Sequence, residues 1–347
     1  MKFFFSVFLA LFISAFYGIA NAAVADLTEE EKIEKRLQFN QFVEEELARA
    51  ESERSSAGTD KLWKFSSSSS YGYDSNVNLD SMRRGDGFFQ QIFEGGAEKT
   101  WGPGRWRLKG SAEFFKYDNH ESSDYRSLIL APSFETQIAP KTDFKLQYEL
   151  NSFHYIQNAD LNYLGHRLRP SISYQYNKKF TQTFYTLAEW KDFGTRKALT
   201  AADTDSDHLR SDKGYEAGTG LRFSPDTKKV LGVTVAYKTN DSNDLFHDFN
   251  DSEGMKLSGY AYFQLPRKFS TIAYGGYHFK KYEARTFLTG SDETQEDDFF
   301  YLGNSLYYDV SPSWQVVFSY LYKQNYSNDP AQTYSGYTLT AGMNLML

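Results

Sequence analysis

Charged side chains recur at alternate positions in three segments of this 347-residue chain, and they are the residues best suited to act on a solute. They are Arg107, Lys109 and Glu113, then Lys145 and Glu149, then Arg167 and Arg169. Successive side chains of a β-strand point to opposite faces, so each set would share one strand face, and charges on that face require water. We expect these residues to line a lumen, where they would either select solutes by charge or fill the space with salt bridges.

Side chains for covalent or metal chemistry are few. The absence of cysteine excludes disulfides, thiolate nucleophiles and Cys-ligated metals. The triplet His120-Glu121-Ser122 contains a base and a nucleophile, but it falls in a predicted loop. The other histidines have no metal-like spacing, and no Gly-x-Gly-x-x-Gly or Walker sequence is present. The sequence therefore predicts no enzyme, and no catalytic, cofactor-binding or metal site.

The composition favours a chain with one apolar and one polar face. There are 26 Tyr and 30 Phe residues, yet the mean hydropathy is −0.60. The net charge of −7, with no basic stripe, argues against nucleic acid as a partner. Acidic stretches such as Asp203 to Asp207 lack the glycine and glutamate of an EF-hand loop, so we interpret them as solvated surface.

From Lys61 to Leu347 the chain indicates strands of about 9 to 13 residues with an apolar residue at every second position. The last one is the clearest, because apolar side chains alternate with polar or small ones from Tyr337 to the carboxyl terminus. No run long enough for a transmembrane helix follows residue 22. We therefore predict a transmembrane antiparallel up-and-down β-barrel, and the competing interpretation is a soluble sandwich or propeller.

The connections between these strands alternate in length, which predicts the strand count. Short turns are expected at 102–105, 139–143, 177–179, 224–229, 266–269 and 311–313. Long outer loops are expected at 78–87, 118–124, 157–162, 191–213, 240–253, 283–298 and 325–333. Seven loops and six turns imply about 14 strands, with both barrel ends in the periplasm. The five tryptophans (Trp63, Trp101, Trp106, Trp190 and Trp314) fall at predicted strand ends, as an aromatic girdle requires.

The first 60 residues have a different character. Lys2, an apolar run from Phe3 to Tyr17 and the small-residue site Ala20-Asn21-Ala22 are typical of a secretory signal peptide over residues 1–22. Residues 23–60 then form a predicted periplasmic segment and linker, in which the stretch from Asp26 to Ala57 has the pattern of a charged α-helix. The barrel domain is assigned to residues 61–347.

The segment Tyr71-Gly72-Tyr73-Asp74-Ser75-Asn76-Val77-Asn78 resembles the opening strand of barrels in the surface lipoprotein assembly modifier family and in related exopolysaccharide-export-associated barrels. The resemblance extends over about Lys61 to Leu347. It implies a 14-stranded barrel that helps to move lipoproteins to the cell surface. It carries over no catalytic or client-binding residue to particular positions of this chain.

These observations predict an outer-membrane protein of a Gram-negative bacterium, exported through the Sec pathway. Its function would be that of a pore or export conduit for hydrophilic or surface-destined material. The alternative is a non-conducting accessory barrel whose acidic loops or periplasmic helix bind partners. Expected partners are outer-membrane lipids and lipopolysaccharide, the barrel assembly machinery, and a periplasmic protein bound by residues 26–57, with no cofactor.

Overall fold

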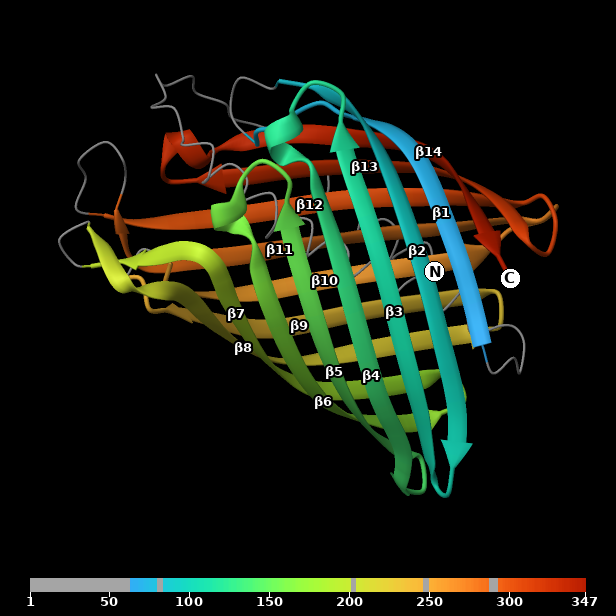
Figure 1. Cartoon of the computed structure of the whole chain (residues 1–347). Helices are drawn as coiled ribbons and strands as arrows, with labels where there is room; N and C mark the ends of the chain where they lie inside the picture. The colour runs from blue at the N-terminus through green and yellow to red at the C-terminus, as the bar shows by residue number, and fades with distance from the viewer. Residues whose placement is uncertain (1–62, 80–83, 201–203, 246–249, 287–292) are drawn as a thin grey trace.

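Fourteen antiparallel strands close into a barrel in the computed structural model, which describes residues 63–79, 84–200, 204–245, 250–286 and 293–347 (Figure 1). Each strand pairs with its neighbours in the sequence, and β1 closes the sheet against β14. The strands are β1 (Trp63–Asp74), β2 (Asp86–Trp101), β3 (Gly104–Tyr117), β4 (Tyr125–Ala139), β5 (Thr142–Tyr155), β6 (Tyr163–Asn177), β7 (Phe180–Leu199), β8 (Asp205–Asp226), β9 (Lys229–Ser242), β10 (Ser252–Gln264), β11 (Phe269–Thr286), β12 (Thr294–Asp309), β13 (Trp314–Ser327) and β14 (Tyr334–Met346). The predicted fold class and strand number are confirmed.

The closing seam leaves no free sheet edge. Nine residue pairs join β1 to β14, from Ser66 opposite Met346 to Asp74 opposite Thr338. Phe65 and Leu347 then exchange backbone hydrogen bonds, since Leu347 N donates to Phe65 O at 2.9 Å. The predicted terminal strand is therefore the element that completes the barrel.

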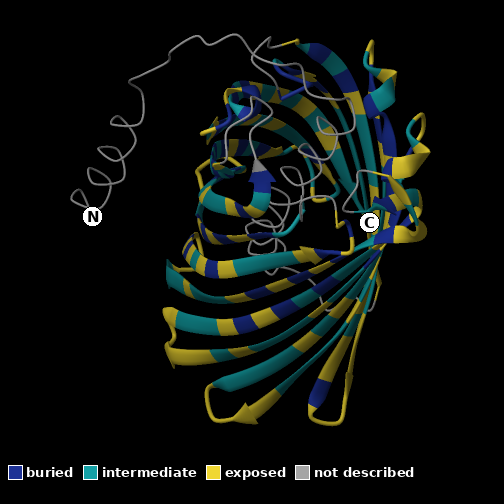
Figure 2. Ribbon diagram, turned by 90° about the vertical axis from the view of Figure 1, so that its left-hand side faces the viewer, coloured by how far each residue is buried: buried dark blue, intermediate teal, exposed yellow. Residues whose placement is uncertain are grey.

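Exposed and less exposed residues alternate along the strands (Figure 2). In β3 the exposed apolar side chains are Trp106, Leu108 and Phe114, and in β9 they are Leu231, Val233, Val235 and Tyr237. A water-soluble protein buries such side chains, whereas a barrel in a bilayer places them against lipid. We call the face that carries them the outer face, and the opposite one the inner wall.

The six short turns lie where the alternation predicted them, with two to four residues between strands, as in β2 to β3 and β12 to β13. Gly102 and Lys141 have positive φ angles of 60° and 65°, which tight two-residue turns require. Trp63, Trp101, Trp106 and Trp314 all lie at or near strand ends on this side, as predicted.

The outer connections after β1, β3 and β5 have about the predicted length, whereas the other four are shorter than predicted because their strands continue past the apolar band. The expected loop at 191–213 is mostly strand, since β7 extends to Leu199 and β8 begins at Asp205. The expected loops at 240–253 and 283–298 shrink in the same way. Trp190 consequently lies within β7 and not at its end. The prediction was wrong here because polar residues on both faces resemble a loop, although backbone pairing still extends the strand.

Two outer connections share one design. After β3 and after β5 the chain makes a short 3-10 turn, at Glu121–Ser123 and Ala159–Leu161. The next residue, Asp124 or Asn162, accepts a hydrogen bond through its side chain from the last backbone N–H of the preceding strand. The donors are the N–H groups of Tyr117 and Tyr155, at 2.7 and 2.6 Å. Both connections are thereby held over the end of the barrel.

The predicted signal peptide and the predicted helix from Asp26 to Ala57 lie outside the described residues. In the described part of the chain, no helix has the length and hydropathy that crossing a membrane requires.

Candidate functional site

A chain of charges crosses the inner wall from β5 to β9. Glu149, Arg167 and Glu189 stand opposite one another in successive strands. Arg167 Nη1 lies 3.3 Å from Glu149 Oε1, and Arg167 Nε lies 3.5 Å from Glu189 Oε1. The Glu189 carboxylate also lies 3.7 Å from Lys191 Nζ and 3.6 Å from Lys238 Nζ. Three cations therefore share the Glu189 carboxylate.

The next acid along the wall, Glu216 of β8, has its own partners. Its Oε2 accepts from Lys256 Nζ at 3.1 Å, and its Oε1 accepts from the Tyr185 hydroxyl at 2.7 Å. The Tyr185 ring in turn lies under the Arg169 guanidinium, 4.2 Å from its centroid. Cation and ring attract each other through the ring quadrupole. These contacts extend the chain of charges to Lys256 of β10 and connect Arg169 to it through the Tyr185 ring.

Nearer the short turns, charge is balanced. Arg107 Nε lies 2.8 Å from Glu98, and Arg107 Nη1 lies 3.2 Å from Glu135. Arg105 contacts the same two carboxylates at 3.5 and 3.3 Å. Two arginines and two glutamates thus form a closed group at this end of the inner wall.

The remaining predicted acid, Glu113, lies away from the cations. It accepts from Gln90 Nε2 at 2.7 Å and from the Tyr125 hydroxyl at 3.0 Å. Both donors are neutral, so Glu113 takes part in no ion pair among the described residues.

Three of the predicted inner-wall cations, Lys109, Lys145 and Arg169, have no carboxylate oxygen of the described residues within 4 Å. Lys145 stands opposite Glu135 in the register, yet the two arginines hold that carboxylate. We call Lys109, Lys145 and Arg169 the inner cation group. Cations left without a counter-ion are available to an anionic solute.

The opposite inner wall, on β9 to β13, is aromatic. Tyrosine rings lie against glycines of the neighbouring strand: Tyr260 against Gly232, and Tyr301 against Gly276. The buried members of this tyrosine wall are Val230, Tyr262, Ile272, Tyr274, Phe299, Tyr301 and Tyr307. Rings that cover strand glycines stabilise those strands by packing.

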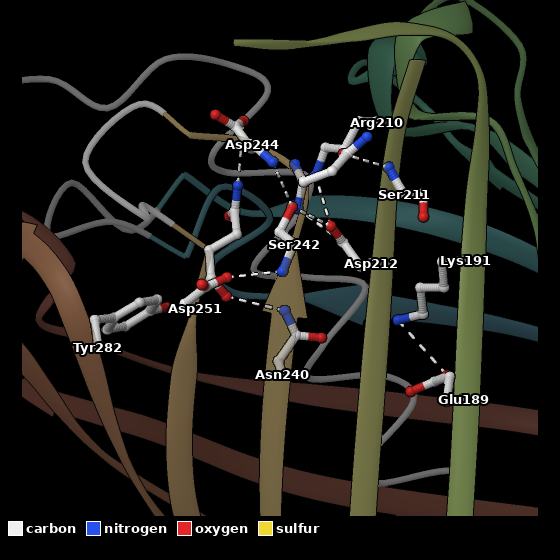
Figure 3. Close-up of polar contacts among 12 residues, drawn as sticks. Glu189, Lys191, Arg210, Ser211, Asp212, Asn240, Ser242, Asp244, Asp251 and Tyr282 are labelled. Carbon is white, nitrogen blue, oxygen red and sulfur yellow. Dashed lines mark hydrogen bonds and ion pairs between the residues drawn. The ribbon is translucent and has the colours of Figure 1, made fainter. Parts of the chain in front are cut away.

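The outer end of the inner wall carries a second aromatic group and buried ion pairs, among them Arg210 with Asp212. Phe115 and Tyr125 stack with ring centroids 5.0 Å apart, and similar contacts run from β2 to β7. Next to Phe193, the last ring of this row, Arg210 of β8 donates to both oxygens of Asp212, at 3.0 and 2.8 Å (Figure 3). The Ser242 hydroxyl donates to the same carboxylate at 2.6 Å. These contacts fix the outer ends of β8 and β9.

The structure brings some of the predicted site residues together and separates others. Glu149 contacts Arg167, and Arg169 lies two positions further along β6, whereas Arg107 and Glu113 have separate partners. The sequence analysis missed Glu189, Glu216, Lys238 and Lys256. Val235, Tyr237, Met255 and Leu257 are exposed on the outer face. Strict alternation then puts Lys238 and Lys256 on the inner wall, so the sequence pattern contained the signal.

The described residues contain no cluster of His, Asp and Glu side chains arranged to hold a metal ion. His120 Nδ1 lies 3.0 Å from Asp86 Oδ2, which also accepts the His120 backbone N–H. That histidine therefore anchors the loop after β3.

Comparison with known proteins finds only distant similarity. No protein-family model matches the chain, and no curated protein matches it in sequence. Among solved structures, the outer-membrane channel DcaP of Acinetobacter baumannii is similar at 9% identity over 82% of this chain and 96% of that one, with a TM-score of 0.48. A mutant of the monoaromatic hydrocarbon channel TodX is similar at 8% identity over 83% and 90%, with a TM-score of 0.46.

A third structure, a bacterial polysaccharide outer-membrane secretin, is similar at 9% identity over 84% of this chain and 99% of that one, with a TM-score of 0.43. These similarities are too distant to support an argument about the fold, which is established by the strand pairing of this chain. The resemblance to the lipoprotein assembly modifier family is not shown and stays a prediction.

Proposed function

We propose that this chain is an outer-membrane pore for hydrophilic solutes that carry negative charge. The observation that carries the proposal is the inner cation group, three cations without a carboxylate partner on the inner wall of a closed barrel. The outer face carries exposed apolar side chains over many strands, which supports a bilayer location. The inner wall is the only surface of such a barrel where a solute can pass.

The size of the barrel is compatible with this role. A barrel of about eight strands is filled by its own side chains, and one of about 16 to 18 strands encloses an aqueous channel. Fourteen strands lie between these cases, so the side chains on the inner wall decide how much space remains. Lys109, Lys145 and Arg169 come from three different strands, β3, β5 and β6. A solute that follows the wall would meet them in succession.

Charge reversal tests this proposal. The refolded mature protein is inserted into planar bilayers, and the reversal potential is measured across a KCl gradient. We expect anion selectivity in the parent protein and its loss or inversion in the double variant Lys109→Glu, Lys145→Glu. Lys99→Glu, which changes an exposed lysine near the short turns, is the matched control and should keep the parent's selectivity. Cation selectivity in the parent would contradict the proposal.

One observation favours a second function, that of a closed accessory barrel. Ile272 and Tyr301 lie on the inner wall and are fully buried, which a wall facing open water would not produce. In that case the lumen is occupied and the loops or the segment from Asp26 to Ala57 bind partners. Absence of conductance in the parent protein would favour this function. Conductance that appears only when residues 26–57 are deleted would identify that segment as the plug.

Transport of lipoproteins or polysaccharide would be a special case of the first function. It has the resemblance of Tyr71 to Asn78 in its favour. A direct test is whether a tagged surface lipoprotein reaches the cell surface when this chain is expressed with it.

A further inference from the structure

The outer face has a basic patch near the end of β3, β4 and β5. Arg126 stands directly opposite His154 in the register of β4 and β5, and Lys116 is the diagonal neighbour of Arg126 on β3. Directly opposed side chains on one sheet face have Cβ atoms about 5 Å apart, and diagonal ones about 7 to 8 Å. We call Lys116, Arg126 and His154 the outer basic patch.

These side chains lie on the lipid side and not on the inner wall. Each alternates with a buried aromatic residue of the inner wall, since Phe115, Tyr125 and Phe153 are all buried. Lys116 and Arg126 are exposed, and His154 is half-buried. On the same face, exposed Phe114 precedes Lys116 and exposed Leu128 follows Arg126. The patch therefore borders the apolar band on its outer side, at the level of lipid headgroups.

The cations of the patch have no acidic partner. Among the described residues, no carboxylate lies within ion-pair distance of any of the three, although Asp118 follows the end of β3, two residues after Lys116. The Asp118 carboxylate instead accepts the hydroxyl of Tyr71 from β1. Elsewhere on the outer face near this end, Tyr237 donates to Glu253, and Lys281 lies 3.2 Å from Glu296.

We propose that the outer basic patch binds the phosphate groups of a phosphorylated glycolipid in the outer leaflet, the lipid A part of lipopolysaccharide. Arginine and lysine next to an apolar surface fit a ligand whose phosphates sit directly above acyl chains. The acyl chains would lie on Phe114 and Leu128 while the phosphates contact Lys116, Arg126 and His154. This inference rests on the proposed outer-membrane location, but it does not depend on whether the lumen conducts.

Binding to the full mature protein in detergent micelles tests the proposal. The probes are diphosphoryl lipid A, the same lipid after removal of its phosphates, and phosphatidylglycerol as a simple anionic lipid. Affinity is read by native mass spectrometry and by microscale thermophoresis. We expect the parent protein to prefer diphosphoryl lipid A by at least tenfold over the dephosphorylated form. Equal affinity for the two forms would overturn the proposal.

The triple variant Lys116→Gln, Arg126→Gln, His154→Gln should lose about tenfold in affinity for diphosphoryl lipid A and bind the dephosphorylated lipid as before. The matched control is Lys99→Gln, Lys178→Gln, Lys179→Gln, which removes three exposed cations near the short turns. An equal loss in the control would mean that net charge, and no particular site, attracts the lipid, and would overturn the proposal. If the triple variant fails to refold, Arg126→Gln alone should lower the affinity about threefold.

The outcome is separable from that of the pore experiment. A barrel that binds diphosphoryl lipid A through this patch and stays silent in planar bilayers would remove the pore and keep the lipid site. A conducting barrel with no preference for the phosphorylated lipid would keep the pore and overturn the lipid site.

Discussion

The charged wall, which is the chain of ionic contacts from Glu149 of β5 to Lys256 of β10, and the tyrosine wall of β9 to β13 fill inner-wall positions in two ways. On the charged wall, carboxylates hold cations in chains, as Glu189 does with Arg167, Lys191 and Lys238. On the tyrosine wall, rings lie on glycines and bury apolar residues such as Ile272. Polar groups can respond to a solute, whereas packed rings stiffen the sheet. Under the proposed pore function, the charged wall acts on solutes and the tyrosine wall supports it.

The largest effect is expected on the charged wall at Glu189. Glu189→Ala leaves Arg167, Lys191 and Lys238 without the carboxylate that they share, and an unbalanced, partly buried charge is costly. We expect a loss of about 3 kcal/mol in the free energy of unfolding. Urea unfolding followed by tryptophan fluorescence measures it. Glu98→Ala is the control, because its pairs with Arg105 and Arg107 are exposed and should contribute less than about 1 kcal/mol.

A smaller loss is expected on the tyrosine wall. A Cβ atom at Gly276 would lie 2.6 Å from the buried ring of Tyr301, so the ring has to move. Gly276→Ala should lower the free energy of unfolding by about 1 to 3 kcal/mol. At Gly110 the nearest atom to an added Cβ lies 3.7 Å away, which is ordinary contact. If Gly110→Ala proves as damaging as Gly276→Ala, the ring and glycine packing does not support the sheet.

The connection between β5 and β6, which joins two strands of the charged wall, offers a third test. Asn162→Ala removes the acceptor for the backbone N–H of Tyr155. A single lost hydrogen bond of this type should lower the free energy of unfolding by about 1 kcal/mol. Protease cleavage between β5 and β6 should also become faster than in the parent. Unchanged cleavage and stability would show that the side-chain contact does not hold the loop.

The smallest effect concerns pH. Burial raises the pKa of the Asp124 carboxyl, so the folded state favours its protonated form. The stability that the protonated Asp124 carboxyl provides is present at low pH. It is lost as the pH rises above about 4, the ordinary aspartate pKa, and through the raised pKa of the folded state. Asp124→Asn makes the first loop resemble the second, which has Asn162 at this place. The variant should gain stability relative to the parent as the pH rises from 4 to 7, measured by urea midpoints.

The sequence predicted the barrel well and the charge contacts poorly. Alternation along single strands is a local property, so the outer face from Leu231 to Tyr237 and the short turns could be derived directly. Contacts such as Lys238 with Glu189 depend on the register of three strands, which a single sequence does not reveal. The long outer strand ends were missed for a related reason, since their pairing partners and not their residue types hold them in place.

Cysteine accessibility tests most directly whether the charged wall faces a solute path, and the natural chain has no cysteine to interfere. Lys145→Cys on the inner wall and Leu146→Cys on the outer face would be treated with a water-soluble, negatively charged thiosulfonate while conductance is recorded. We predict that Lys145→Cys reacts and that its conductance and anion selectivity change, while Leu146→Cys remains unmodified. An inner cysteine that does not react, with conductance unaltered, would contradict the account.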